Sequence, residues 1–148
     1  MRWLVDTNVL LRGAQASHPM YGVVSNAVEI LRTRHDDVYV IGQNLVEFWA
    51  VATRPIANNG LGVSISEAEQ ELIRLKLLFG ILPDTPEVFD HWEKLVVEHQ
   101  VIGKQAHDTR LVAAMLVHHL THLLTFNDRD FKRFTEVTVR NPKEITEE

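Results

Sequence analysis

Several acidic residues of this chain stand where an apolar segment would be expected to continue. Asp6 directly follows a short apolar run, and Glu47 is the only charged residue in an otherwise apolar stretch. Asp108 precedes the apolar residues 111–117, and Asp130 lies shortly after another apolar segment. An ionised carboxylate beside apolar side chains is costly unless a cation or hydrogen bonds compensate its charge. Several such acids in one small protein suggest a shared compensation, and a divalent metal ion is the simplest candidate.

Strands and helices are predicted to alternate along the chain, from the apolar periodicity and the turn residues. Residues 7–19 are expected to form a polar loop, and the residues after Pro142 are expected to fray. Ser66 and Glu69 have the spacing of a capping box for one of the helices. Strands are expected at residues 2–6, 38–41, 80–83, 123–126 and 137–140, and helices at 20–34, 43–53, 67–79, 85–102 and 107–119, with a helical turn at 129–134.

This alternation implies a parallel sheet with helices on both faces. Ligand sites of such sheets collect at the carboxyl ends of the strands, where the strand order reverses. Asp6 and residues 127–130 follow predicted strand ends, and Glu47 and Asp108 lie on helices that can converge there. The sequence therefore predicts that the four acids share one region.

Length and composition indicate a single globular unit, placed at residues 1–142 with a polar tail at 143–148. The chain has no cysteine, which excludes disulfides, thiolate zinc sites and cysteine nucleophiles. Its first apolar run is too short for a signal peptide or a membrane span, so we expect a cytoplasmic protein without membrane contact. The net charge of −5 argues against broad affinity for duplex DNA. It does not exclude a nuclease, because metal-binding acids themselves add negative charge.

Each acid also has a purely structural interpretation. Asp6 could form an Asx turn, Asp108 could cap a helix, and the pair 127–128 could begin a turn. Glu47 could form a salt bridge with Arg54 or Arg110. Taken together, however, the acids fit metal-assisted phosphodiester hydrolysis, which needs several oxygen ligands around one or two hard cations. A less tightly held carboxylate can then orient or deprotonate the attacking water.

The chain resembles PIN-domain proteins, and among them the VapC-type ribonuclease toxins of toxin–antitoxin pairs. The segments that carry the resemblance contain Asp6-Thr7-Asn8, Asn44-Leu45-Val46-Glu47, His107-Asp108-Thr109-Arg110, Leu124-Thr125-Phe126-Asn127-Asp128 and the closing Val139-Arg140-Asn141-Pro142. The resemblance covers nearly the whole chain and rests on several motifs in order. It implies an α/β fold, a PIN-like three-layer α/β/α arrangement with a short, mainly parallel central sheet.

For the site, the resemblance implies a Mg²⁺- or Mn²⁺-dependent endoribonuclease with Asp6 and Asp108 as central metal ligands. Glu47 and Asp130 would complete the acidic pocket, directly or through waters. Asp128 competes with Asp130 for the fourth position, because Asn127 stands where many relatives have Asp; we favour Asp130. The residues expected to support the pocket are Asn8, Thr125, Asn127 and Asp128, and those considered for RNA contact are Arg12, Arg54, Lys104 and Arg110.

The partners implied by the resemblance are an RNA substrate, a small cognate antitoxin and a second copy of the chain. The competing hypothesis is a non-catalytic PIN-like module that binds RNA or protein. A haloacid-dehalogenase-like phosphatase is disfavoured, since Asn8 stands where that chemistry needs an acid. A zinc site built on His118 and His122 is also disfavoured, because no Glu lies between them and both fall near a helix end.

Overall fold

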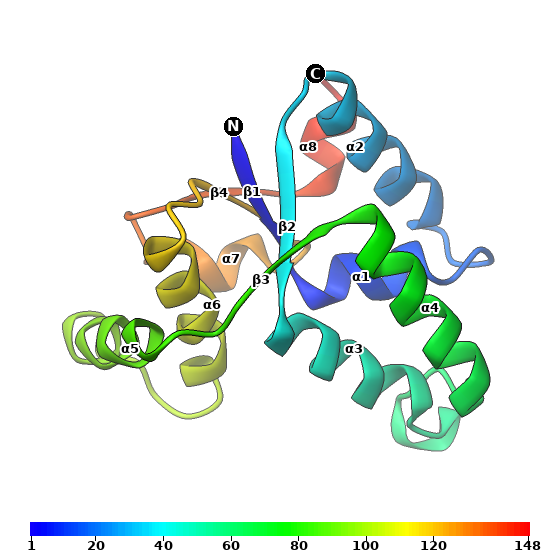
Figure 1. Ribbon diagram of the computed structural model, residues 1–148, viewed down its shortest axis with the longest axis horizontal. Helices are drawn as coiled ribbons and strands as arrows, with labels where there is room; N and C mark the ends of the chain where they lie inside the picture. Colours follow the sequence, from blue (N-terminus) through cyan, green and yellow to red (C-terminus); the bar gives the residue numbers. More distant parts are fainter.

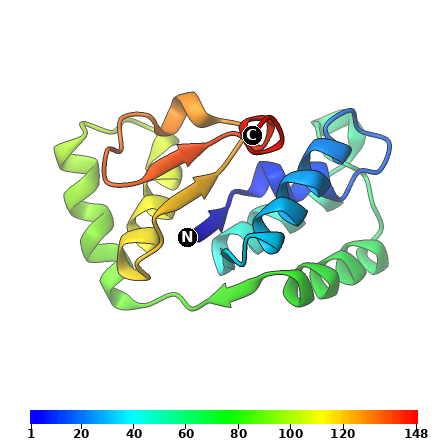
Figure 2. The same cartoon turned by 90° about the horizontal axis from the view of Figure 1, so that it is seen from above.

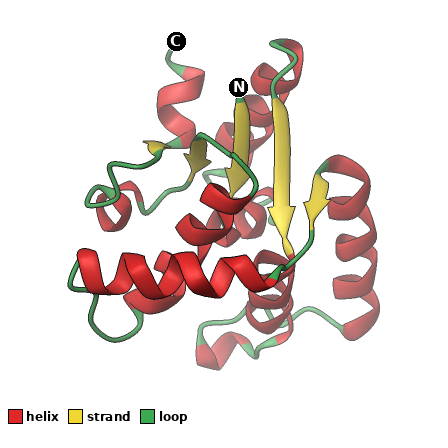
Figure 3. Cartoon of the chain, turned by 60° about the vertical axis from the view of Figure 1, so that its left-hand side comes forward, coloured by secondary structure: helices red, strands yellow, loops and turns green.

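Five parallel strands form the centre of the molecule. The computed structural model describes residues 1–148 and orders the strands β3-β2-β1-β4-β5 (Figure 1). The chain moves outward from β1 to β3 and then returns to the other side of β1, so the strand order reverses between β1 and β4. The strands are β1 (Arg2–Val5), β2 (Asp37–Ile41), β3 (Gly80–Leu82), β4 (His122–Leu124) and β5 (Thr138–Arg140), and Figure 3 shows them in yellow among the helices.

Apolar residues face both sides of this sheet. Trp3 and Val5 of β1 belong to one hydrophobic core and Leu4 to the other, and the same alternation separates Val40 from Ile41 in β2. A parallel sheet buried on both faces requires such continuous apolar strands. The strands therefore divide the interior into two cores, each covered by its own helices.

Two groups of helices complete the layers (Figure 2). The prediction of a three-layer α/β/α fold with a parallel central sheet is confirmed. No helix combines the length and the apolar character needed to cross a membrane. One core is built with α1 (Thr7–Gly13), α2 (Tyr21–Thr33), α3 (Gly42–Thr53), α4 (Ile65–Leu78) and α8 (Pro142–Thr146), the other with α5 (Pro86–Glu98), α6 (Gln105–Val117) and α7 (Asp128–Phe131), while η1 (Ile56–Asn58) is a short 3-10 turn.

The expected polar loop after the first strand is wrong, because residues 7–13 form helix α1. The carboxylate of Asp6 accepts a hydrogen bond from the backbone N–H of Thr7 and caps this helix. Val9 and Leu10 are buried in the first core, so tertiary packing outweighs the loop-forming tendency of Asn8 and Gly13.

Two further local predictions need correction. The capping box of α4 lies two residues earlier than predicted, because the hydroxyl of Ser64 accepts from the backbone N–H of Glu67 at 3.1 Å. The tail does not fray: residues 142–146 form α8, which begins at a cap provided by Asn141. Ile145 is only 1% exposed and packs in the first core. Helix α8 lies beside α2 (Figure 1).

Candidate functional site

The sheet topology brings the ends of β1, β2 and β4 together. Leu124 of β4 pairs in register with Val5 of β1, and the carbonyl of Leu124 accepts a hydrogen bond from the backbone N–H of Asp6 at 3.0 Å. Helix α3 begins at the end of β2, where the buried side chain of Asn44 accepts from the N–H of Ile41 at 2.9 Å. This is the point where the strand order reverses, at the lower end of the strands in Figure 1.

Asp6 is buried at this point, with 6% of its surface exposed. One carboxylate oxygen accepts from the N–H of Thr7 at 2.8 Å. The other accepts from the hydroxyl of Thr125 at 2.8 Å and from the amide of Asn8 at 3.3 Å. Three donors from two elements therefore hold this carboxylate in one orientation, and no Lys or Arg side chain pairs with it.

The pKa of Asp6 is raised to about 6, chiefly by burial and also by the neighbouring carboxylates of Asp108 and Glu47, while the hydrogen bonds from Thr125 and Thr7 lower it. Asp6 therefore lies in the same region as Asp108 and Glu47, as the sequence predicted.

Glu47 lies on α3 and faces α1. One of its oxygens accepts from the hydroxyl of Thr7 and the other from the side-chain amide of Gln43, at 2.8 and 2.9 Å. The alternative of a salt bridge from Glu47 to Arg54 or Arg110 is wrong, because neither guanidinium contacts it. The carboxylate of Glu47 is therefore held by two neutral donors and by no cationic side chain.

Asp108 occupies the first turn of α6, but Lys104 occupies the cap position, so the helix-cap interpretation of Asp108 is wrong. The carboxylate is half-buried and forms no hydrogen bond to another protein group. Its pKa is raised to about 6, chiefly by burial and also by Asp130 and Glu47, while His107 and Lys104 lower it. The negative charges of Glu47 and Asp130 thus both act on the carboxylate of Asp108.

Asp130 and Asp128 point to different surroundings. Asp130 is exposed on α7, acts on the pKa of Asp108 and forms no side-chain hydrogen bond. Asp128 accepts from the side-chain amide of Asn141 at 3.1 Å. Asn127 contributes its backbone N–H to the hydroxyl of Thr125 at 3.0 Å, while its own side chain caps nothing.

Thr125 and Asn8 link the strand ends. The hydroxyl of Thr125, which donates to Asp6, accepts from the amide of Asn8 at 3.2 Å. The side-chain oxygen of Asn8 accepts in turn from the N–H of Phe126 at 3.1 Å. Sequence reasoning missed Thr7 and Gln43 as donors to Glu47. The position of Gln43 four residues before Glu47 on a helix was the available signal.

The acids form an open cluster rather than a tight cage. No three of them bring their oxygens within 4.8 Å of one another, a spacing met only by the ligand atoms of Glu98, His99 and Glu136 at the end of α5. Mg²⁺ retains several waters and is commonly bound through few carboxylates, so an all-oxygen set at wider spacing fits such a cation. No Lys or Arg forms an ion pair with any of the four acids.

Two of the four basic residues considered for RNA contact lie at the acids. Lys104 is near enough to lower the pKa of Asp108. Arg110 lines a cavity of about 430 Å³ together with Glu47. Arg12 and Arg54 bond only to nearby residues of their own chain segments.

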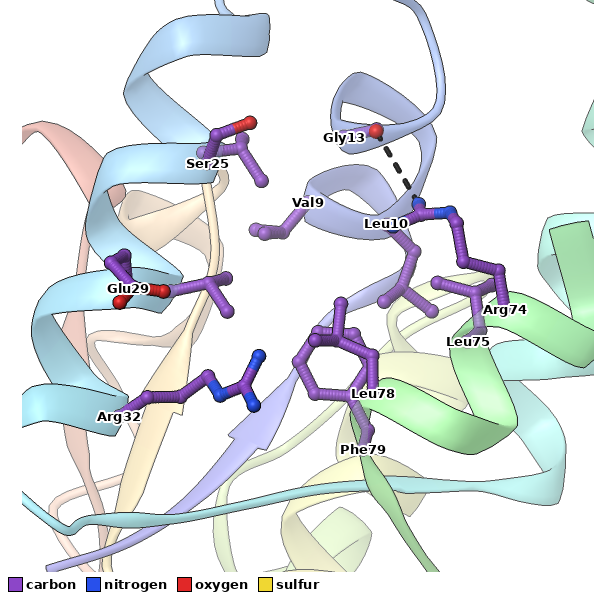
Figure 4. A pocket seen from close by; sticks show the side chains of 12 residues that line it. Val9, Leu10, Gly13, Ser25, Glu29, Arg32, Arg74, Leu75, Leu78 and Phe79 are labelled. Atoms are coloured by element: carbon purple, nitrogen blue, oxygen red, sulfur yellow. Dashed lines mark hydrogen bonds between the residues drawn. The ribbon is translucent and has the colours of Figure 1, made fainter.

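A separate apolar cavity of about 180 Å³ lies between α1, α2 and α4 (Figure 4). Val9, Leu10 and Leu75 contribute apolar walls, and Arg74 at one side donates to the carbonyl of Gly13 at 3.4 Å. None of the four acids lines this cavity. It is therefore a different surface from the acidic cluster.

The chain matches a protein family by sequence and several solved structures by fold. The PIN domain model matches residues 3–137. A search of curated protein sequences finds no match.

Several solved structures share the fold. VapBC2 from Rickettsia felis, bound to a promoter DNA fragment, has 15% identity and a TM-score of 0.75, covering 95% of this chain and 98% of that one. FitAcB from Neisseria gonorrhoeae has 22% identity and a TM-score of 0.65, covering 95% and 97%. VapC20 from Mycobacterium tuberculosis, a toxin that cleaves the sarcin–ricin loop, has 17% identity and a TM-score of 0.61, covering 82% and 86%. The chain belongs to the PIN domain family.

Proposed function

We propose that the protein is a metal-dependent endoribonuclease and the toxin of a toxin–antitoxin pair. The observation that carries this proposal is the cluster of Asp6, Glu47 and Asp108 at the ends of the strands, with no cationic side chain paired to any of them. Glu47 raises the pKa of both Asp6 and Asp108, and Asp108 raises that of Asp6. A structural role would favour paired or neutralised acids, because uncompensated buried charge destabilises the fold. Clusters of this kind are typical of sites that bind a cation and perform chemistry.

In this proposal Asp6 and Asp108 hold Mg²⁺ or Mn²⁺, and Glu47 and Asp130 complete the set directly or through waters. When bound, the cation would polarise the RNA phosphate and lower the pKa of a water. Asp6 and Glu47 are oriented in advance by their hydrogen bonds, so little ordering is needed when the site loads.

The free carboxylate of Asp130 is the group best placed to orient the attacking water and accept its proton, because no hydrogen bond engages it. Lys104 lies beside Asp108 and would contact the RNA phosphates. Arg110 lies at the same end of the sheet, where its guanidinium contacts Gln43 and Asp84. Asp128 accepts a hydrogen bond from Asn141 and would support the pocket without binding the cation itself.

The proposal includes an RNA substrate, a small cognate antitoxin and a homodimer in the cytoplasm. Solved structures with this fold include toxin–antitoxin complexes, which supports a protein partner. An arginine from the antitoxin would bind the unpaired acids well, because a guanidinium can engage carboxylates in bidentate fashion. The alternative remains a non-catalytic PIN-like module that binds RNA or protein through the same surface.

The deciding experiment incubates the purified protein with structured RNA in Mg²⁺, in Mn²⁺ and in EDTA. We expect cleavage only with a divalent cation, and near-complete loss in Asp6→Asn and Asp108→Asn, because an amide lacks the charge that binds a hard cation. Asp90→Asn is the matched control, since Asp90 is exposed on α5 outside the cluster. RNA binding without cleavage by the wild type would favour the non-catalytic module, and full activity in either cluster variant would refute the site.

A further inference from the structure

Gln43 joins the two helices that carry Glu47 and Asp108. Its side-chain nitrogen donates to the carboxylate of Glu47 on α3 at 2.9 Å and to the backbone carbonyl of His107 on α6 at 3.0 Å. His107 immediately precedes Asp108. A single amide group therefore links the position of one acid to that of the other.

No packing contact within a common core can set this spacing. The buried residues of α3 lie in one hydrophobic core and those of α6 in the other, on opposite faces of the sheet. The hydrogen bonds of Gln43 with His107 and with Arg110 are the ones that connect α3 to α6. This polar bridge is thus a direct link between the two helices, in addition to the sheet on which both layers pack.

Arg110 determines which way the amide of Gln43 points. The guanidinium donates to the side-chain oxygen of Gln43 at 2.9 Å and pairs with the carboxylate of Asp84 at 3.1 Å. Rotating the amide by half a turn would place its nitrogen against a guanidinium that can only donate, and its oxygen against a carboxylate and a carbonyl that can only accept. Arg110 therefore keeps the N–H groups of Gln43 directed at Glu47 and His107.

We propose that Gln43, oriented by Arg110, is a positioning residue that sets Glu47 relative to Asp108 so that both acids serve one cation. The inference rests on the proposed metal-dependent function and deepens it. It gives Arg110 a role other than the phosphate contact: its charge is already engaged by Asp84 and Gln43, and it acts on the site through the amide.

The test is the Mn²⁺ affinity of the folded protein, measured from thermal shifts across a Mn²⁺ concentration series. Groups that orient metal ligands typically change metal affinity by about 10- to 100-fold when removed. We expect a loss of about tenfold or more in Gln43→Leu and in Gln43→Met, neither of which can donate to Glu47 or adds a charge to the cluster. Arg74→Met is the matched control, because Arg74 is an exposed, ion-paired arginine far from the acids.

Arg110 is tested by a double-mutant cycle. Arg110→Met should weaken Mn²⁺ binding, and the double variant with Gln43→Leu should bind Mn²⁺ no more weakly than Gln43→Leu alone, because Arg110 acts through the amide. In RNA cleavage at saturating Mn²⁺, Gln43→Leu should lower kcat with little change in KM. A residue that only binds phosphate would instead raise KM and leave Mn²⁺ affinity unchanged.

Mn²⁺ affinity of both Gln43 variants within twofold of the wild type would overturn the inference, as would additive losses in the double variant. The melting temperature in EDTA checks that each variant is folded, and two variants with different side chains guard against a single misfolded protein. A wild type that shows no Mn²⁺ response would refute the proposed metal site itself, and this inference with it.

Discussion

Asp108→Asn should stabilise the metal-free protein at neutral pH. The carboxylate of Asp108 forms no hydrogen bond to another protein group, while burial and the charges of Asp130 and Glu47 raise its pKa from 3.8 to about 6. Two pKa units correspond to about 3 kcal/mol between the two protonation states. The side chain is partly exposed, so solvent screening reduces this to about 1.5–2 kcal/mol.

One loss opposes this gain. Asp108 lies in the first turn of α6, where a negative charge is favourable by about 0.3–1 kcal/mol. The net expectation is therefore a stabilisation of about 1 kcal/mol, which for a chain of this size corresponds to a rise in melting temperature of about 2–4 °C.

The effect should depend on pH with a defined sign. The folded-state pKa lies above the unfolded value, so the folded protein binds more protons between about pH 4 and pH 6. The stability of the metal-free wild type should thus fall as pH rises through this window, and the advantage of Asp108→Asn should vanish near pH 4. Asp6, whose pKa is also raised to about 6, adds to the slope in the same direction.

The assay is thermal unfolding in EDTA at pH 4, 5, 6 and 7.5, with Asp90→Asn as the control for neutralising an exposed acid. The same series with Mg²⁺ or Mn²⁺ should reverse the order, because the cation stabilises the wild type more than the variant. A variant that is less stable than the wild type in EDTA at pH 7.5, or a difference that does not change with pH, would refute the reasoning.

The other predictions concern the support of the site, the tail and the assembly. Thr125→Val removes the hydroxyl that donates to Asp6 and leaves buried donors without a partner, which should cost about 1–3 kcal/mol in chemical denaturation. The same change should move the acid limb of the pH–rate profile upward, which pH-dependent cleavage assays would detect. Ile145→Ala should lower stability by about 2–4 kcal/mol, measured by denaturant unfolding, because this side chain is fully packed in the first core; an unchanged midpoint would mean that α8 is dispensable. Light scattering at micromolar concentration should give twice the chain mass, and a monomer would count against the proposed dimer.

The local pattern of apolar and polar residues was sufficient to predict most of the helices and strands. The strands were predicted because apolar residues such as Leu4 and Val40 run continuously, as a sheet covered on both faces requires. Helix α1 was not predicted because its polar residues are typical of a loop. It forms because its apolar residues are buried against α2 and because Asp6 caps its first turn. The tail helix α8 is stabilised in the same way by one buried residue, Ile145.

The sequence by itself singled out Asp6, Glu47 and Asp108, because a charge that interrupts an apolar segment is visible without any structure. It also identified the end of the sheet where they meet, since parallel strands place their carboxyl ends together. What holds each carboxylate was decided only by the tertiary structure. The hydroxyl of Thr125 reaches Asp6 across 119 positions of the chain, and that of Thr7 reaches Glu47 across 40. Hydrogen bonds between residues so distant in sequence depend on how the strands are ordered in the sheet, and no local pattern of residues records that order.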